Sequence, residues 1–139
     1  MALEIGQIRH VALFTPRLKA HARFYTDVWG LDQVSEDADA VYFRGSSPEQ
    51  FILSLHASDR RGLHHIAYAL PDEESVERAA ALLKKSNIRL VEEPHVLNEP
   101  GGGFGLRFID PDGRCIELSS GASDHKSGWH SKNVEPRSI

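Results

Sequence analysis

The sequence predicts an α+β domain made of two tandem βαβββ modules, whose strands form half-open curved sheets around a cavity. Two observations support this prediction. Strand-like and helix-like segments follow the order strand, helix, three strands, and then the same order again. In addition, His10-Val11-Ala12 followed by Pro16 matches His65-Ile66-Ala67 followed by Pro71, at an offset of 65 − 10 = 55 residues. A duplicated module is the best single explanation of both patterns.

The chain of 139 residues has the composition of one soluble globular domain, with 40% hydrophobic and 26% charged residues. Its net charge of −4 offers no attraction for nucleic acid or an anionic membrane, and no apolar run approaches the roughly 20 residues that span a bilayer. The N-terminal residues mix polar with apolar side chains, unlike a signal peptide. A single cysteine excludes an internal disulfide, so we expect a cytoplasmic protein.

The first module begins with a strand over Ile8–Phe14 and continues into a helix. Thr15 and Pro16 are the predicted N-cap and first helical residue, and Gly30 ends the helix. Between these ends, apolar residues at helical spacing form one stripe, which consists of Leu18, Ala22, Tyr25 and Trp29. Three strands are predicted to follow, over Leu31–Val34, Ala40–Arg44 and Phe51–His56.

The second module begins with a strand over His64–Leu70. Its helix opens at Pro71-Asp72, buries Val76, Ala80 and Leu83, and ends near Ser86-Asn87. The predicted strands that follow are Ile88–Val91, Phe104–Ile109 and Cys115–Ser119. Between the first two of them, Glu93–Gly103 contains two prolines and three consecutive glycines, which predicts a mobile loop.

These elements place one domain at residues 1–120, with modules at about 5–57 and 62–120. Residues 121–139 are polar and lack periodicity, which is typical of a tail or linker.

The repeat makes four positions equivalent, namely His10, Ser54, His65 and Glu117. Side chains two apart in a strand share a face, and small residues such as Ala12 share a face with the candidate ligands, which leaves room for a cavity. Two imidazoles and one carboxylate are the set that holds divalent iron or manganese with positions left open. We therefore predict a metal site of His10, His65 and Glu117.

Each of these residues could instead have a purely structural role and bind no metal. A lone histidine on a strand is more often a hydrogen-bonded structural residue than a ligand, so the prediction depends on the symmetry-related pair. By strand alternation, His64 points to the face opposite His65 and is interpreted as structural. Cys115 is interpreted as a small buried hydrophobe. The remaining histidines are assigned no metal role: His21, His56, His95, His125 and His130.

These residues resemble the vicinal oxygen chelate superfamily, which includes glyoxalase I, bleomycin-resistance proteins, methylmalonyl-CoA epimerase and type I extradiol dioxygenases. The matching motifs cover about residues 5–120 and are I-R-H-V-A-L at Ile8–Leu13, F-Y-T-D-V-W-G-L at Phe24–Leu31, L-H-H-I-A-Y at Leu63–Tyr68 and D-P-D-G-R-C-I-E-L at Asp110–Leu118. Glu36–Gly45 looks most like the N-terminal half of an extradiol dioxygenase such as catechol 2,3-dioxygenase, and the segments Ser123–His130 and Val134–Ile139 are similar to the linker before its second domain.

The resemblance implies the glyoxalase/dioxygenase fold and a site in which His10, His65 and Glu117 hold Fe(II) or Mn(II) beside a bound catecholate. Ser54 stands where glyoxalase-type members often carry a fourth, glutamate ligand. Arg107 stands where the extradiol signature has a tyrosine, and the histidine expected upstream of it is missing because His95 lies too far back. In two-domain members the first domain is metal-free, and this chain could correspond to such a domain.

Three functions are therefore open. The first is a divalent-metal-dependent extradiol dioxygenase, or its N-terminal domain, that cleaves a small catechol-like aromatic. The second is a glyoxalase-, epimerase- or thiol-transferase-type metal enzyme. The third is a metal-free binding module of the bleomycin-resistance type. Because a half-open sheet leaves apolar surface uncovered, we also expect a homodimer. Because Arg107 replaces the signature tyrosine and the tail resembles an interdomain linker, we expect weak or absent ring-cleavage activity.

Overall fold

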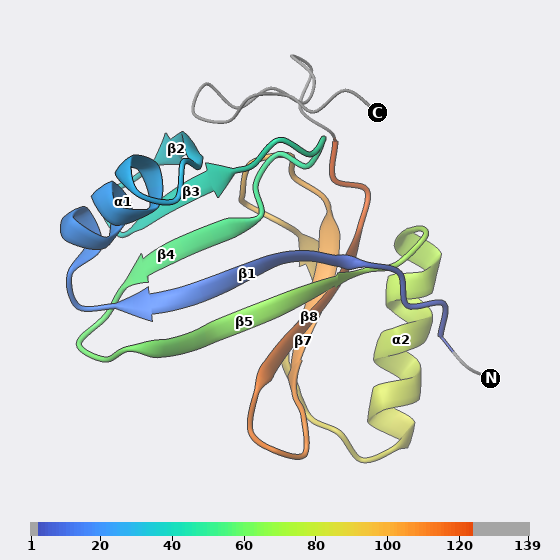
Figure 1. Cartoon of the computed structure of the whole chain (residues 1–139). Coiled ribbons are helices and arrows are strands. Elements are labelled where there is room, and N and C mark those ends of the chain that lie inside the picture. The colour runs from blue at the N-terminus through green and yellow to red at the C-terminus, as the bar shows by residue number, and fades with distance from the viewer. Residues whose placement is uncertain (1–2, 124–139) are drawn as a thin grey trace.

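The computed structural model describes residues 3–123, which form one curved eight-stranded sheet with helices packed against it (Figure 1). The first module comprises β1 (Ile8–Thr15), α1 (Leu18–Asp27), β2 (Asp32–Glu36), β3 (Ala40–Arg44) and β4 (Leu53–Ala57). The second comprises β5 (Gly62–Ala69), α2 (Glu73–Lys85), β6 (Leu90–Val96), β7 (Phe104–Ile109) and β8 (Cys115–Ser120). The predicted fold class and the predicted order of elements are confirmed.

The two modules have the same strand pairing, as expected for a duplication. The order across the sheet is β2-β3-β4-β1-β5-β8-β7-β6, so the two modules join where β1 pairs with β5. Within each module the first and last strands run parallel, with Ala12 opposite Ser54 in one and Ala67 opposite Glu117 in the other. Because these two pairs are repeat-equivalent, the sheet has a pseudo-two-fold axis at the β1–β5 seam.

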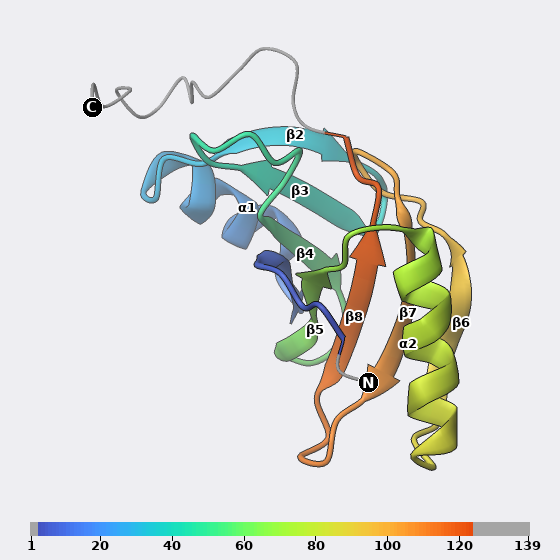
Figure 2. The same ribbon diagram turned by 90° about the vertical axis from the view of Figure 1, so that its right-hand side faces the viewer.

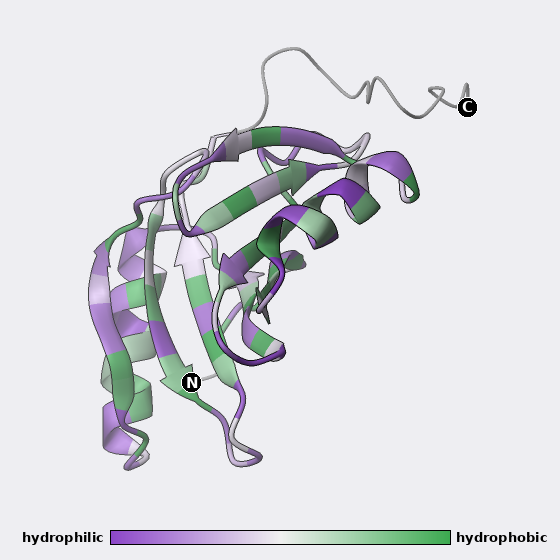
Figure 3. Ribbon diagram, turned by 90° about the vertical axis from the view of Figure 1, so that its left-hand side faces the viewer, coloured by the Kyte–Doolittle hydropathy of each residue, from purple (hydrophilic) through white to green (hydrophobic). Residues whose placement is uncertain are grey.

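Each helix covers its own module on one face of the sheet. α1 contacts β3 and β4, whereas α2 contacts β6, β7 and β8 (Figure 2). Phe43 and Leu55 are fully buried beneath α1, and Val76 and Leu106 are fully buried in the cluster formed with α2. Hydrophobic and hydrophilic residues alternate along strands such as β8 (Figure 3). Because successive side chains in a strand point to opposite faces, the polar ones are directed to the face without helices.

The helix ends agree with the prediction in one module only. Asp72 caps α2 by accepting a hydrogen bond from the Ser75 backbone N–H, and α2 buries the three predicted residues. The predicted cap Thr15 is instead the last residue of β1, and Arg17 occupies the N-cap of α1 without a side-chain bond. The chain still turns at Thr15, because its hydroxyl accepts from the Arg17 N–H.

The apolar stripe of α1 is shorter than predicted. Ala22 is buried, and Leu18 and Tyr25 pack against the same core cluster. Trp29 lies beyond the end of the helix and is 62% exposed, so it does not continue the stripe.

The predicted loop at Glu93–Gly103 is also shorter, because β6 extends to Val96. Pro94 is accommodated since β6 is an edge strand, where a missing N–H breaks no ladder bond. The remaining residues include a β-turn in which the Gly102 N–H donates to the Glu99 carbonyl, with Pro100 and Gly101 at its centre. Gly101 has a φ of 85°, the value that a type II turn requires of its third residue.

No helix among the described residues is long and apolar enough to cross a membrane. Most of the predicted tail, from residue 124 onward, lies outside the described residues.

Candidate metal centre

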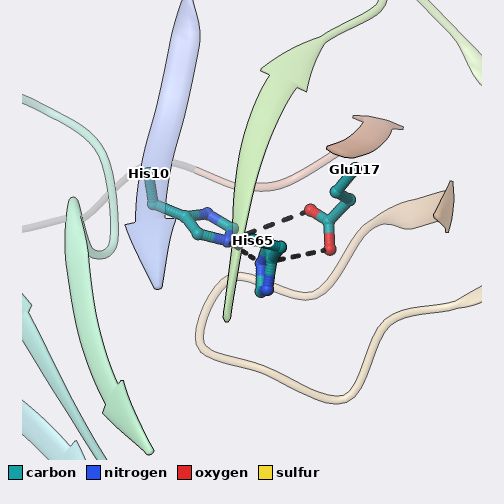
Figure 4. A group of neighbouring side chains, drawn as sticks. All are labelled: His10, His65 and Glu117. Atoms are coloured by element: carbon teal, nitrogen blue, oxygen red, sulfur yellow. Dashed lines mark hydrogen bonds and ion pairs between the residues drawn. The ribbon is translucent and has the colours of Figure 1, made fainter. Parts of the chain in front are cut away.

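His10, His65 and Glu117 converge on the face of the sheet opposite the helices, as predicted. Their ligand atoms all lie within 4.8 Å of one another (Figure 4). The two Nε2 atoms are 2.9 Å apart, and the Glu117 carboxylate oxygens lie 3.6 Å from His65 Nε2 and 3.9 Å from His10 Nε2. The three side chains come from β1, β5 and β8, which are neighbours in the sheet.

The register of the seam explains why the two histidines meet. His10 pairs with Ala67, and Ala12 pairs with His65, so each imidazole faces a methyl group across the seam. Because alanine fills little of the space above the sheet, the imidazoles lean toward each other. The sequence pattern H-[VI]-A thus supplies both a candidate ligand and the small residue beside it that leaves room for the other imidazole.

All three candidate ligands are buried. His10 and His65 are 2% and 1% exposed, and Glu117 is fully buried. Burial, aided by nearby arginines, lowers the pKa of His10 to about 3 and lowers the pKa of His65 further. Both imidazoles are therefore neutral at physiological pH, which is the form that ligates a metal.

Glu117 is held by partners outside the triad. The Arg107 guanidinium donates to its Oε1 from Nε and Nη2, both at 3.1 Å. The Ser119 hydroxyl donates to Oε2 at 3.0 Å and itself accepts a hydrogen bond from Arg9. These contacts fix the orientation of the carboxylate and compensate its charge in the sheet.

Two β-bulges place additional side chains beside the site, and they correct the prediction for His64. In the β1–β5 ladder, Arg9 and His64 are the unpaired residues, each just before a candidate ligand. A bulge re-aims the extra side chain, and His64 Nδ1 accordingly lies 2.8 Å from His65 Nδ1. Alternation of faces failed here because it assumes an uninterrupted ladder.

His56 lies beside His64 and was not predicted near the site. Their rings are 4.4 Å apart, and His56 Nε2 is 2.9 Å from the Ser54 hydroxyl. Ser54 is buried but bonds to His56 rather than to the candidate ligands. Cys115 is only half-buried, and burial raises its thiol pKa, so it stays protonated.

Glu99 is a site residue that the sequence analysis missed. Its side chain is 8% exposed, and Oε2 lies 4.0 Å from His10 Nε2. Burial and the neighbouring Glu117 raise the pKa of Glu99 to about 8. The signal that could have located it is the motif E-P-G, which predicts a type II turn that fixes the preceding glutamate.

The triad fits a divalent ion in both chemistry and dimensions. Ligand atoms at 2.0–2.2 Å from one ion are about 3 Å apart when they meet at right angles. The observed separations of 2.9, 3.6 and 3.9 Å approach that value, so small side-chain shifts suffice. Two neutral imidazoles and a carboxylate are also the donor set typical of iron and manganese.

Comparison with known proteins agrees with this geometry. Residues 7–118 match the family model described as the glyoxalase/bleomycin resistance protein/dioxygenase superfamily. The chain belongs to that superfamily. Its sequence is 32% identical over 121 residues to the manganese-dependent 2,3-dihydroxybiphenyl 1,2-dioxygenase of Geobacillus genomosp. 3, an alignment that covers 85% of this chain and 38% of the relative. It is 26% identical over 118 residues to the metapyrocatechase of Geobacillus stearothermophilus, which covers 83% of this chain and 35% of that protein.

Solved structures of superfamily members match as well. The Mn(II)-bound glyoxalase from Novosphingobium aromaticivorans superposes with a TM-score of 0.84 at 33% identity, over 88% of this chain and 41% of that chain. Homoprotocatechuate 2,3-dioxygenase from Brevibacterium fuscum, in complex with 3,4-dihydroxyphenylacetate, gives a TM-score of 0.82 at 25% identity, over 90% of this chain and 39% of that chain. The chain thus spans about two fifths of the length of these relatives.

Proposed function

We propose that this chain is a Mn(II)- or Fe(II)-binding domain of an extradiol-type dioxygenase, which acts on a small dihydroxy-aromatic compound. The observation that carries the proposal is the convergence of His10, His65 and Glu117 at one buried point. Relatives named as dioxygenases, one of them manganese-dependent, support this reaction class. In this proposal the three residues are the metal ligands.

The surroundings of the site suit an aromatic substrate. A cavity of about 180 Å³ adjoins His10, and its lining includes Phe51 and Arg9. The Phe51 ring packs against the His10 imidazole at 4.3 Å between centroids, which leaves an apolar wall beside a candidate ligand. In the proposed complex the substrate ring lies along this wall and its two hydroxyls point toward the triad.

Each residue of the site has a defined task in this proposal. A bound divalent ion supplies Lewis acidity that favours ionisation of the substrate hydroxyls. Arg107 and Ser119 donate hydrogen bonds that orient the Glu117 carboxylate, and Ala12 and Ala67 leave space beside the imidazoles. The burial of all three side chains limits the access of solvent to the triad.

The test has two steps. Anaerobically purified protein is titrated with Mn(II) and with Fe(II) in a calorimeter, and oxygen uptake is then followed with catechol, 3,4-dihydroxyphenylacetate and 2,3-dihydroxybiphenyl. We expect metal binding near one ion per chain and slow formation of yellow ring-cleavage product. Binding of neither metal would overturn the proposal, whereas binding without turnover would restrict this chain to a metal-binding domain of a longer enzyme.

A glyoxalase-type activity is the second candidate, and one structural observation favours it. Glu99 places a second carboxylate near His10, and a carboxylate beside a metal ion suits proton transfer within a substrate. The match to a Mn(II)-bound glyoxalase is consistent with this candidate. Turnover of a hemithioacetal without oxygen uptake would favour it over ring cleavage.

A further inference from the structure

We propose that Glu99 is a fourth protein ligand of the divalent ion, contributed by the turn between β6 and β7. This inference rests on the proposed metal site of His10, His65 and Glu117. It extends that site to a residue outside the three strands that carry the triad.

The first observation is that the Glu99 carboxylate is buried but, within the part of the chain that the structure describes, lacks a hydrogen-bond partner for one of its oxygens. Its side chain is 8% exposed, and Oε1 has no hydrogen-bond partner among the described residues. The other oxygen, Oε2, faces His10 Nε2 at 4.0 Å, which is too far for a hydrogen bond. Buried carboxylates are normally paired or coordinate a metal, because burial of an uncompensated charge is strongly unfavourable.

The second observation concerns charge balance around the site. The Arg107 guanidinium contacts Glu117 at 3.1 Å and Glu92 at 3.4 Å, so its single positive charge is shared by two carboxylates. Among the described residues, the only ion-pair contact of Glu99 is the one with His10, which is neutral. A divalent cation at the triad would compensate the charges of two carboxylates, Glu117 and a metal-bound Glu99.

The third observation is the position of Glu99 relative to the pseudo-two-fold axis. Glu117 has Ser54 as its repeat-equivalent residue, so the first module offers no carboxylate from its own last strand. Glu99 approaches from that side: it lines a pocket with Tyr42, and Tyr42 is the register partner of Ser54. The proposed site therefore receives one histidine and one carboxylate on each side of the seam.

The turn that carries Glu99 is built to fix this approach. The Leu97 N–H donates to the Gly103 carbonyl at 2.8 Å, which closes the loop, and Leu97 is itself buried. A Cβ atom on Gly103 would lie 2.8 Å from the Ser120 carbonyl oxygen, so only glycine lets the loop pack this closely on β8. The loop thus rests on the same strand that carries Glu117.

The test measures the coordination of Mn(II) as well as its affinity. Wild-type protein and the variants Glu99→Gln and Glu99→Ala are titrated with Mn(II), and water-proton relaxivity counts the exchangeable waters on the bound ion. Glu49→Gln is the matched control, since Glu49 is a carboxylate that lines the cavity beside His10 and accepts a hydrogen bond from Gln7. Thermal unfolding of each metal-free variant confirms that it is folded.

We expect Glu99→Gln to weaken Mn(II) binding about tenfold or more, and Glu99→Ala to add one exchangeable water, while Glu49→Gln changes neither. If Glu99→Ala weakens Mn(II) binding but the number of waters on the bound ion is unchanged, the inference is overturned. Glu99 would then act on the ion through its charge and would not coordinate it. Equal affinity in wild type and both Glu99 variants would overturn it as well, and would leave the three-residue site intact. Absence of Mn(II) binding in wild-type protein would instead overturn the proposed function.

Discussion

His10 Nε2 and His65 Nε2 lie 2.9 Å apart across the seam between β1 and β5. Two neutral imidazoles at this distance share one hydrogen bond, so one nitrogen donates and the other accepts. A metal ion would require the lone pairs of both nitrogens and would replace that bond. The metal-free protein thus holds the pair near the separation that a ligated ion needs.

Replacement of Glu117 tests the triad most directly. Glu117→Gln removes the only carboxylate among the three proposed ligands, and we expect it to reduce Mn(II) affinity by at least about a hundredfold and to remove any turnover with it. Isothermal titration with Mn(II) is the measurement. Ser54→Ala is the matched control, because Ser54 is the repeat-equivalent residue and bonds to His56 instead. Unchanged affinity in Glu117→Gln would show that the ion, if any, binds elsewhere.

We expect Arg107 to lower the affinity of the site for a divalent ion. Its guanidinium donates two hydrogen bonds to Glu117 Oε1, and its charge has the same sign as that of the proposed ion. We expect Arg107→Met to tighten Mn(II) binding about tenfold, and to lower the melting temperature of the metal-free protein because Glu117 loses its partner. The rise in melting temperature on Mn(II) addition should therefore be larger than in wild type.

Arg114→Gln provides the comparison for Arg107. Arg114 forms exposed ion pairs with Asp110 and Asp112 in the turn before β8, and such pairs contribute little. We expect this variant to match wild type in both measurements. Weaker Mn(II) binding in Arg107→Met would mean that Arg107 supports the site rather than opposing the ion.

Acid should destabilise the metal-free protein through its buried histidines. The pKa of His10 is about 3 in the folded state, against about 6.5 in an unfolded chain. Between these values the unfolded state binds a proton that the folded state rejects, so the free energy of unfolding falls as the pH falls below 6.5. His10 alone contributes a slope of up to about 1.4 kcal/mol per pH unit.

Urea unfolding in the presence of a chelator, at pH 7.5, 6.5 and 5.5, measures this slope. His10→Gln should reduce it by about one proton. Leu106→Ala is a useful comparison, since Leu106 is fully buried in the α2 core and its truncation should lower stability by about 2–5 kcal/mol at every pH. A slope that is identical in wild type and His10→Gln would contradict the neutral, buried state of His10.

The expected homodimer can be tested at the end of α1. Phe24, Val28 and Trp29 are 44%, 70% and 62% exposed, and the rings of Phe24 and Trp29 are 6.5 Å apart. We expect a dimer that buries this patch, and Trp29→Ser should weaken its association by at least about tenfold. Sizing chromatography with light scattering gives the mass. Val91→Thr, on β6, is the control, and a wild-type monomer at high concentration would refute the prediction.

The fold and the triad were predictable because both follow from local patterns. Alternating strands, the Asp72 cap and the repeat of H-[VI]-A specify two modules, and the repeat alone aligns His10 with His65. Glu117 followed from its place in β8, since strand alternation sets its face. The resemblance of Glu36–Gly45 to an extradiol dioxygenase then gave an expected reaction, which the local patterns did not name.

Other features depend on contacts between distant segments, which one sequence does not display. The bulges at Arg9 and His64 arise from the pairing of β1 with β5, so face alternation misplaced His64. Glu99 reaches His10 only because the loop packs on β8. The position of Arg107 was noticed as a departure from a motif, but its double contact with Glu92 and Glu117 follows from the pairing of β6, β7 and β8.

The seam between β1 and β5 also affects how the two halves of the chain depend on each other. His10 belongs to one half, whereas His65 and Glu117 belong to the other, so an ion at the triad would cross-link them. The two halves are joined in sequence only by the short stretch between Ala57 and Gly62. Two fragments cut there could reassemble through the paired strands. If the ion binds only the assembled form, the association constant of the fragments rises in proportion to the ion concentration once that concentration exceeds the dissociation constant of the ion. The affinity between the two fragments, measured at several metal concentrations, would thus report how much of the site is occupied.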